Sequence, residues 1–349
     1  MNIGVPRETK PGERRVGLDA HAVRALSGEG FSVRVERGAG AGIGTSDEDF
    51  ARAGGTIVVR ADAWDSDLVV KVKEVQDGEC ARLRAGSTLF SFQHLVGAPA
   101  QTRRLAAAGV TVIAFEMVRD VQGGFPILAP MSVLAGRLAI EAAVAHGAAL
   151  ARVLVLGAGH AGREAVRGAL ERGAQVTVLC RRESSRDALR AEFGARIDAG
   201  LATPEAVEQA ALLADAIVGA VFVAGSATPR LLPRTLVTRM KRGAVIVDVC
   251  IEEGGISETS RPTTHEQPTF VEQGVVHYAV GNMPAIVPEV ATQALAKAAL
   301  PYVRSLAAKG ALQAVQDDAG LRAGTLLWNG QVINAAIAKE AGLACARLP

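Results

Sequence analysis

A glycine-rich turn between two short apolar segments constrains the fold of this chain more than any other feature. Residues 153–156 form a continuous apolar run, as expected for a strand buried on both faces of a parallel sheet. Gly157, Gly159 and Gly162 follow with the spacing G-x-G-x-x-G, and a helical pattern leads to a second apolar run at 176–179. This order predicts a β-α-β unit that holds the pyrophosphate of a dinucleotide at the start of its helix. The alternative is a glycine-rich connection in an α/β domain that binds no dinucleotide.

The residues after the second apolar run indicate which dinucleotide binds. An Asp or Glu at this place normally hydrogen-bonds the adenosine ribose 2′-hydroxyl, but here the sequence has Cys180, Arg181 and Arg182. A carboxylate would repel a 2′-phosphate, whereas arginine binds one through charge-assisted hydrogen bonds. The sequence therefore favours NADP(H). NAD(H) stays possible if both arginines are solvated surface charges, or if the nearby Glu183 serves the ribose.

Composition limits the classes of protein to which the chain can belong. Its 349 residues suggest two domains, and with 49% hydrophobic but only 4% aromatic residues the core should be mostly aliphatic. The formal net charge of +2 and the lack of a long basic run argue against a nucleic-acid partner. The four cysteines are scattered, so we expect no metal centre and a reducing compartment.

The sequence also shows no signal for export or membrane insertion. It begins directly with a strand pattern and a polar loop, which is not the pattern of a signal peptide. We find no run of about 18 or more apolar residues, the length that a membrane-spanning helix needs. We therefore expect a cytoplasmic protein without a membrane partner.

Strand and helix patterns predict an α/β fold. The expected elements are strands at 2–5, 31–36, 67–73, 88–92, 110–115, 215–221 and 244–249, and helices at 19–29, 131–148 and 287–308, besides the β-α-β unit. We assign residues 129–288 to a doubly wound Rossmann domain that binds NAD(P). Residues 1–128 and 289–349 are expected to form a discontinuous substrate domain, flavodoxin-like or Rossmann-like, because the last forty residues are too short for a domain of their own.

Polar side chains follow three of these strands, where α/β domains place ligand-binding groups. Arg15 lies in a polar loop after the first strand, and a guanidinium there suits a substrate carboxylate. Lys71 and Lys73 end an apolar strand and are expected on one face of it. His94 directly follows another strand and can transfer protons near neutral pH. Taken alone, such an arginine is more often a surface charge and such a histidine a structural one.

Two segments in the dinucleotide-binding half are further candidates. Glu252 and Glu253 follow an apolar strand directly before two glycines, which suits an active-site acid or, equally, a solvated pair in a loop. Asn282 lies in a proline-punctuated loop before a helix, where its amide can face a nicotinamide. By themselves these residues do not define a reaction.

Specific motifs extend over nearly the whole chain. They include GVPRETKPGERRVGL, VVKVKE, LFSFQHL, VLVLGAGHAG and VVHYAVGNMPAIVP, in this order. With these motifs the sequence resembles the alanine dehydrogenase family, which includes the nucleotide-binding alpha subunit of pyridine nucleotide transhydrogenase. The resemblance implies an NAD(P)-dependent oxidoreductase acting on CH–NH2 groups, which interconverts an L-amino acid with its 2-oxo acid or imine and ammonia. We also expect a homo-oligomer.

The resemblance implies a role for each candidate residue. Arg15 matches the arginine that binds the substrate carboxylate, Lys73 the lysine that polarises the substrate carbonyl, and His94 the proposed acid/base. Glu252 stands where the family carries an active-site aspartate, and Asn282 is expected to contact substrate and nicotinamide. The remaining matches are cofactor contacts: Met131 and Ser132 in a loop beside it, the turn residues Gly157, Gly159, His160, Ala161 and Gly162, then Cys180, Arg181 and Arg182 at the ribose, and Val221 and Met283.

The sequence departs from the family pattern at several places. Glu252 is one methylene longer than the usual aspartate, Val75 replaces a proline and Val133 replaces a glutamate. Cys180 and Arg181 replace the ribose-binding aspartate, and a glycine-rich segment before residue 153 is missing. Together these changes favour a specialised relative whose cofactor and substrate have both shifted.

Three alternatives stay open from the sequence. A dehydrogenase of the opine or saccharopine type would form a secondary amine, with an amino acid in place of ammonia. A transhydrogenase subunit would bind NAD(H) without substrate catalysis, although the retention of Lys73 and His94 argues against it. A non-catalytic NADP-binding homologue would keep the glycine turn, and the change at Glu252 is compatible with it.

Overall fold

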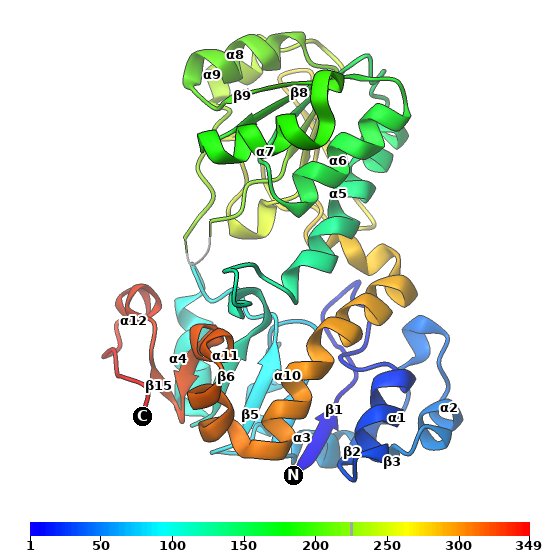
Figure 1. The fold of residues 1–349 in the computed structure, drawn as a ribbon, viewed down its shortest axis with the longest axis vertical. Coiled ribbons are helices and arrows are strands. Elements are labelled where there is room, and N and C mark those ends of the chain that lie inside the picture. Colours follow the sequence, from blue (N-terminus) through cyan, green and yellow to red (C-terminus); the bar gives the residue numbers. More distant parts are fainter. Residues whose placement is uncertain (224–225) are drawn as a thin grey trace. The chain divides into compact units, whose positions relative to one another are not determined.

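The computed structural model describes residues 1–223 and 226–349, and the chain divides into two compact units. Unit 1 consists of Met1–Met131 and Ala285–Pro349, and unit 2 consists of Ser132–Pro284. Each unit has a sheet of its own with helices packed against it (Figure 1). The predicted class, an α/β fold with two domains, is confirmed.

Unit 1 is built on an eight-stranded sheet of order β15-β14-β6-β5-β4-β1-β2-β3. Its parallel strands are β1 (Asn2–Val5), β2 (Ser32–Glu36), β3 (Thr56–Val58), β4 (Leu68–Val70), β5 (Thr88–Ser91) and β6 (Thr111–Ala114). β14 (Thr325–Trp328) pairs antiparallel with β6, and β15 (Gln331–Val332) pairs with β14. The C-terminal segment therefore completes the sheet that the N-terminal residues begin.

The strands at the centre of this sheet are buried along their whole length. Every residue of β4, β5 and β6 is buried, which is why these segments read as continuous apolar runs rather than as an alternating pattern. Helix α1 (Ala20–Gly28) starts after Asp19, whose side chain accepts a hydrogen bond from the backbone N–H of Ala22. The other elements of unit 1 are α2 (Asp47–Arg52), α3 (Arg60–Trp64), α4 (Pro99–Ala107), α10 (Pro288–Asp317), α11 (Ala319–Gly324), α12 (Ala335–Ala341) and the 3₁₀ turns η1 (Ala41–Ile43), η2 (Cys80–Arg82) and η3 (Phe115–Met117).

Unit 2 has a seven-stranded sheet of order β12-β13-β11-β10-β7-β8-β9. Its parallel strands are β7 (Arg152–Leu156), β8 (Gln175–Cys180), β9 (Ile197–Leu201), β10 (Ala216–Gly219), β11 (Val245–Asp248) and β13 (Val275–Tyr278), and β12 (Thr269–Glu272) is an antiparallel edge strand. The strand order reverses at β7, because β8 and β9 lie on one side of it and β10 and β11 on the other. In doubly wound sheets, ligands bind at the carboxyl ends of the strands at such a switch point.

Helices pack on the sheet of unit 2 and connect it to the rest of the chain. They are α5 (Leu128–Ala145), α6 (His160–Glu171), α7 (Glu183–Phe193), α8 (Pro204–Leu213) and α9 (Arg234–Val237), with the 3₁₀ turns η4 (Gly194–Arg196), η5 (Ile251–Glu253) and η6 (Met283–Ile286). α6 follows β7 directly and leads into β8, so the predicted β-α-β unit is present (Figure 1).

The strand predicted at 67–73 is shorter in the structure and ends at Val70. Beyond it the pairing with the segment of β5 is irregular: the backbone N–H of Val72 donates to the carboxylate of Glu8 at 2.6 Å, while its carbonyl oxygen accepts from the N–H of Phe92 at 2.9 Å. The helix predicted at 131–148 is present as α5, which begins at Leu128. Met131 and Ser132, which the family resemblance placed in a loop, therefore lie near the start of this helix.

Helix α5 is long and apolar enough, by length and composition alone, to cross a membrane, with a mean hydropathy of 1.5 over 18 residues. The helix contains Arg137 and Glu141, so it is not the uninterrupted apolar run whose absence was predicted. It also packs closely on α6, since a Cβ on Gly136 would lie 2.1 Å from the carbonyl oxygen of Ala161. A core helix can meet the same criterion of length and composition.

Candidate active site

Three predicted substrate-binding residues follow three neighbouring strands of unit 1. Arg15 follows β1, Lys73 follows β4 and His94 follows β5. β1 pairs with β4 and β4 pairs with β5, all in parallel, so the carboxyl ends of the three strands lie at one edge of the sheet. The loop that bears Arg15 passes against the end of β4, because a Cβ on Gly17 would lie 2.5 Å from the carbonyl oxygen of Val70.

Arg15 is buried, with an exposed fraction of 2%, and is not a solvated surface charge. One carboxylate oxygen of Glu13 accepts hydrogen bonds from the backbone N–H of Arg15 at 2.8 Å and from its Nε at 2.9 Å. The other oxygen accepts from Nη2 at 2.7 Å, and Nη1 contacts the sulfur of Met131 at 3.2 Å. This two-point pairing holds the plane of the guanidinium in one orientation.

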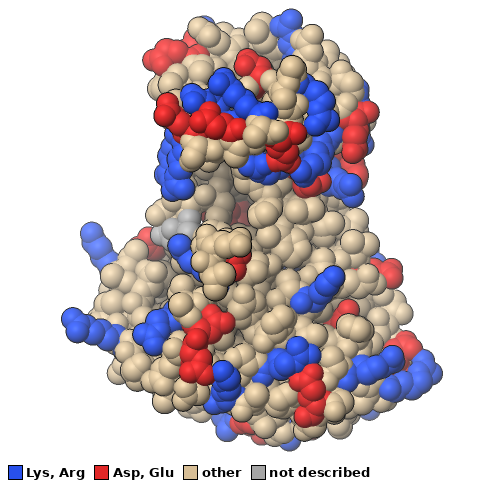
Figure 2. Space-filling model, viewed as in Figure 1, with Lys and Arg blue, Asp and Glu red and all other residues tan. Residues whose placement is uncertain are grey.

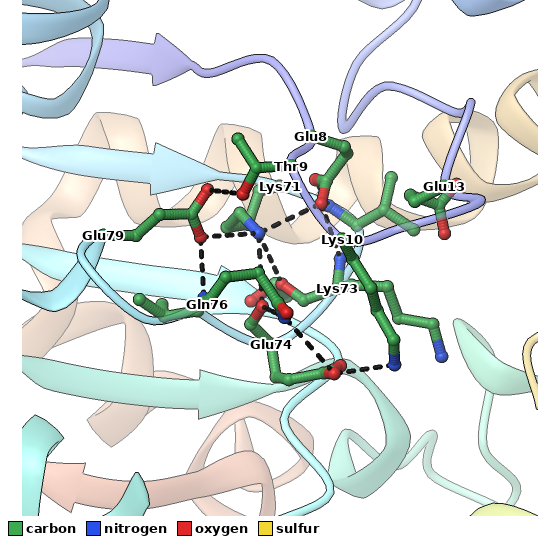
Figure 3. Close-up of polar contacts among 12 residues, drawn as sticks. Glu8, Thr9, Lys10, Glu13, Lys71, Lys73, Glu74, Gln76 and Glu79 are labelled. Atoms are coloured by element: carbon green, nitrogen blue, oxygen red, sulfur yellow. Dashed lines mark hydrogen bonds and ion pairs between the residues drawn. The ribbon is translucent and has the colours of Figure 1, made fainter. Parts of the chain in front are cut away.

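The two lysines after β4 lie in different environments, which Figure 3 shows. Lys71 is fully buried, and its Nζ lies 3.0 Å from the carboxylate of Glu8 and 3.4 Å from that of Glu79. Burial lowers the pKa of Lys71, but the two carboxylates outweigh it and the pKa is raised. Lys73 is also buried, and its Nζ lies 5.9 Å from the centre of the Phe92 ring. Lys71 is therefore a structural cation, and Lys73 is the candidate for contact with substrate.

His94 has a backbone conformation that few residues other than glycine adopt, with φ 45°. Its backbone N–H donates to Oε1 of Glu116 at 2.8 Å, and Gln93 donates to the same buried carboxylate. The imidazole stacks near-parallel on the ring of Phe92, with the ring centres 6.0 Å apart. His94 and Lys73 thus share Phe92 as a neighbour.

The glycine turn of unit 2 fits a pyrophosphate, because each of its glycines meets a different steric demand. Gly157 has φ 118°, and a Cβ there would lie 2.2 Å from the carbonyl oxygen of Ala220. A Cβ on Gly162 would lie 2.1 Å from the carbonyl oxygen of Gly157 itself. Gly159 caps α6, and no atom lies within 4 Å of where its Cβ would be. The open side of Gly159 adjoins the first N–H groups of α6, and dinucleotide-binding units hold a phosphate at this position.

The end of β8 carries the residues that bear on the choice between NAD and NADP. Cys180 is buried, its Sγ contacts the carbonyl oxygens of Arg182 at 3.5 Å and Gly200 at 3.7 Å, and burial raises the pKa of its thiol. Arg181 and Arg182 are exposed, and neither guanidinium has an ion pair among the residues that the structure describes. Glu183 lies 3.8 Å from Arg186. The end of β8 is therefore basic, with a thiol where dinucleotide-binding units usually carry a carboxylate.

The other predicted contacts of unit 2 lie in loops after strands. Glu252 is exposed in η5, and its Cγ would lie 3.3 Å from a Cβ on Gly281, so it neighbours the loop of Asn282. Asn282 has φ 62°, and Met283 beside it is buried. Val221 follows β10, with its backbone nitrogen 3.2 Å from the Cβ position of Gly157. His160 is exposed at the start of α6, whereas Ala161 is buried. The roles of all these residues stay predictions.

Sequence reasoning missed the buried carboxylates that hold the site. These carboxylates bond to the segments of the predicted residues: Glu8 to that of Lys73, Glu13 to Arg15 and Glu116 to that of His94. Glu8 and Glu13 lie in the loop after β1, and Glu116 lies in η3 after β6. Asp248 ends β11, and its Oδ2 accepts the backbone N–H of Ile256 at 3.0 Å. The sequence feature that could have indicated such carboxylates is an acidic residue at, or shortly after, the end of an apolar strand.

Surface charge is mixed on the face of the molecule that Figure 2 shows. Basic and acidic side chains are interspersed there over both units. This pattern accords with the formal net charge of +2. A surface that binds nucleic acid usually gathers lysine and arginine on one face.

Two family models match the chain in succession. The N-terminal domain of alanine dehydrogenase/PNT matches residues 4–135, and the C-terminal domain matches residues 132–335. The chain belongs to the alanine dehydrogenase/PNT family. Among its members, alanine dehydrogenases of Halomonas elongata and Mycolicibacterium smegmatis are 43% and 40% identical to it. Each alignment covers 98% of this chain and 97% of the relative.

Solved structures of alanine dehydrogenase/PNT proteins have the same fold. An L-alanine dehydrogenase is 38% identical and superposes with a TM-score of 0.90 over 97% of this chain and 99% of its own. A transhydrogenase from Sinorhizobium meliloti, 24% identical, has a TM-score of 0.82 over 96% of this chain and all of its own, and shows the fold alone. The predicted family and the prediction of an alanine dehydrogenase-like oxidoreductase are confirmed.

Proposed function

We propose that this member of the family interconverts L-alanine, or an amino acid with a similarly small side chain, with its 2-oxo acid and ammonia. The observation that carries the proposal is the placement of Arg15, Lys73 and His94 after three neighbouring parallel strands. A carboxylate anchor, a cation and an imidazole at one sheet edge suit a substrate that has a carboxylate next to a carbonyl or amine. The near-complete alignment with relatives named alanine dehydrogenase supports this substrate class.

Unit 1 supplies the groups that act on the substrate. Arg15, oriented by Glu13, binds the substrate carboxylate through its guanidinium. The ammonium of Lys73 donates to the oxygen of the 2-oxo acid and stabilises the charge that develops there as the carbon is reduced. His94 holds or releases the proton that moves as the carbonyl is exchanged for an amine.

Unit 2 supplies the groups that hold the pyridine nucleotide. When bound, the nicotinamide supplies the site that gives or takes a hydride. Gly159 and the first N–H groups of α6 hold the pyrophosphate, with Ser132 and Val221 as further contacts. Asn282 orients the nicotinamide amide, and the carboxylate of Glu252 beside it holds the ammonia or the water that attacks the imine.

We further propose that the nucleotide is NADP(H) in preference to NAD(H). Arg181 and Arg182 lie after β8 with exposed guanidinium groups, and no carboxylate stands at the end of this strand. The thiol of Cys180 is uncharged at neutral pH because burial raises its pKa, so it does not repel a phosphate. Two arginines then provide the donors that a 2′-phosphate needs.

We also propose that the protein works in the cytoplasm and forms a homo-oligomer. All four cysteines are free, which suits a reducing compartment. Only 39% of the apolar helix α5 is buried within one chain, and Val144 at its end is 47% exposed. Apolar surface of this kind favours association between copies. Sedimentation velocity should show a species larger than the 36.1 kDa monomer, and a monomer at micromolar concentration would contradict the proposal.

A spectrophotometric assay tests the function directly. Pyruvate and ammonium are mixed with enzyme and either NADPH or NADH, and the oxidation of each nucleotide is followed in parallel. We expect turnover with both and a higher kcat/KM with NADPH. A panel of larger 2-oxo acids, and a second amino acid in place of ammonium, distinguishes the alternatives. If no 2-oxo acid supports oxidation of either nucleotide, the dehydrogenase function is wrong.

A further inference from the structure

The peptide of Lys73 is held from both sides by one buried ion pair (Figure 3). Glu8, in the loop after β1, accepts hydrogen bonds from the backbone N–H groups of Val72 at 2.6 Å and Lys73 at 3.4 Å. Lys71 donates from its Nζ to the carbonyl oxygen of Lys73 at 3.0 Å and to Glu8 at 3.0 Å. The two side chains therefore bond to the N–H and the C=O of the same residue, and to each other.

The surroundings of this pair keep its geometry in place. Glu79, which accepts from Thr9 at 2.6 Å and from the backbone N–H of Gln76 at 2.8 Å, lies 3.4 Å from the Nζ of Lys71. Lys71 has no exposed surface, and Glu8 is 8% exposed. A buried ion pair commonly stabilises a fold no better than apolar side chains of equal volume, so stability alone does not explain it.

Regular strand pairing ends at Val70, although the backbone N–H of Phe92 still donates to the carbonyl oxygen of Val72 at 2.9 Å. The N–H and the carbonyl oxygen of Lys73 itself bond to Glu8 and Lys71, and its Nζ lies over the ring of Phe92. A shift of the peptide would move the ammonium by a similar distance. Near a reacting carbonyl, a displacement of about 1 Å can reduce the rate about 100-fold.

We propose that Glu8 and Lys71 are positioning residues, which clamp the peptide of Lys73 and so direct its ammonium at the substrate. The proposal rests on the function proposed above for Lys73. Neither residue touches the substrate. Loss of the clamp should therefore change how the 2-oxo acid is bound and activated, and should leave the nucleotide site in unit 2 as it is.

Glu36 offers a matched control in the same unit. It is 5% exposed, and its carboxylate accepts from the backbone N–H of Arg7 at 2.9 Å and from Nε of Arg60 at 2.8 Å. This is the same arrangement as at Glu8, a buried glutamate between a backbone N–H and a cation. The difference is that Arg7 has no predicted role in the site.

The experiment compares Glu8→Gln with Glu36→Gln, each with and without Lys73→Met. With pyruvate, ammonium and NADPH, Glu8→Gln should lower kcat/KM for pyruvate at least about 10-fold and leave the KM for NADPH within about 2-fold of the wild type. Glu36→Gln should change neither. In the Lys73→Met background, Glu8→Gln should cause no further loss, since it acts through that lysine. The proposal is overturned if Glu8→Gln causes an equal loss with and without Lys73, or if its kcat/KM for pyruvate equals that of the wild type.

Hydrogen exchange provides a readout that does not depend on turnover. The amides of Val72 and Lys73 should exchange at least about 10-fold faster in Glu8→Gln than in the wild type, and at the wild-type rate in Glu36→Gln. If the wild type reduces no 2-oxo acid, the proposed function is wrong. The exchange rates of the Val72 and Lys73 amides then still test whether Glu8 and Lys71 hold this segment. Unchanged exchange in Glu8→Gln refutes the proposed clamp. If that variant does not fold, the neutral variant Glu8→Gln/Lys71→Gln is measured with the same criteria.

Discussion

The two units hold their proposed ligands in different ways. Unit 2 presents backbone: Gly157 and Gly162 permit a close turn, and Gly159 leaves the start of α6 open. Unit 1 presents charged side chains, Arg15, Lys73 and others, whose local backbone is held by buried carboxylates. A backbone site is encoded by one short segment. A side-chain site of this kind needs residues from several loops, and it is sensitive to changes in residues that never touch the ligand.

The largest effect should come from the side-chain site. Lys73→Met removes the ammonium proposed to stabilise the developing charge on the substrate oxygen, and should reduce kcat/KM for pyruvate about 100- to 1000-fold. The methionine keeps most of the volume of the buried lysine, so the melting temperature should change little. Steady-state kinetics and a thermal melt check both statements. Activity within a few-fold of the wild type would remove Lys73 from the site.

A smaller but selective effect is expected at the backbone site. Gly159→Val places a side chain where no protein atom lies within 4 Å, so the fold should tolerate it. The same side chain obstructs the approach of a pyrophosphate, whose hydrogen bonds each contribute about 1.5–3 kcal/mol. NADPH affinity, measured by fluorescence titration, should fall at least about 10-fold.

Gly162→Ala is the matched control for that variant. Its Cβ would lie 2.1 Å from the carbonyl oxygen of Gly157, so the backbone must move and stability should fall by about 1–3 kcal/mol. Gly159→Val should therefore bind NADPH more weakly while its stability stays that of the wild type. Gly162→Ala should instead be less stable than the wild type. Equal melting temperatures for the two variants would contradict the steric assignment of these glycines.

The preference for NADPH over NADH should depend on the charge of the side chain at position 181. Arg181→Asp replaces an exposed guanidinium after β8 with the acid that is usual at the ribose. Loss of a charge-assisted hydrogen bond, about 1.5–3 kcal/mol, should lower kcat/KM for NADPH about 10- to 100-fold. The value for NADH should fall less or rise. NADPH kinetics equal to those of the wild type would remove the argument for NADP(H).

The smallest predicted effect is on the alkylation rate of Cys180, whose thiol lies at the end of β8. Burial raises the pKa of Cys180, so the thiolate fraction at a given pH is smaller than for an ordinary cysteine and grows only as pH rises past the usual range. Alkylation by iodoacetamide, followed by mass spectrometry at pH 8, should therefore be several-fold slower at Cys180 than at the exposed Cys345. Equal rates would mean that a thiolate stands beside Arg181 and Arg182.

The two sites also differ in how far the sequence predicts them. The glycine turn, its strands and its helix form one segment of chain, so the pattern alone predicted the β-α-β unit. In unit 1 the sequence and the family resemblance pointed to Arg15, Lys73 and His94, because each follows an apolar strand. The carboxylates that hold them were missed. Glu116 pairs with His94 from 22 residues away, and Glu8 with Lys73 from 65, contacts that only the strand order creates.

The expected strand at 67–73 was too long for the same reason. Its apolar alternation continues past Val70, and local pattern gives no sign that a distant carboxylate takes the N–H of Val72. The strand pattern by itself did not distinguish Lys71 from Lys73, because both are lysines at the end of one apolar run, and only the family resemblance pointed to Lys73. The structure adds a physical difference, since Lys71 is buried between Glu8 and Glu79.

The central claim is that unit 1 acts on the substrate and unit 2 holds the nucleotide. NADPH titration of wild type, Lys73→Met and Gly159→Val, with turnover of pyruvate and ammonium measured on the same samples, tests it most directly. Lys73→Met should bind NADPH within about 2-fold of the wild type while it loses turnover, and Gly159→Val should lose affinity for NADPH. If Lys73→Met weakens NADPH binding as much as Gly159→Val does, the division of roles between the two units is wrong.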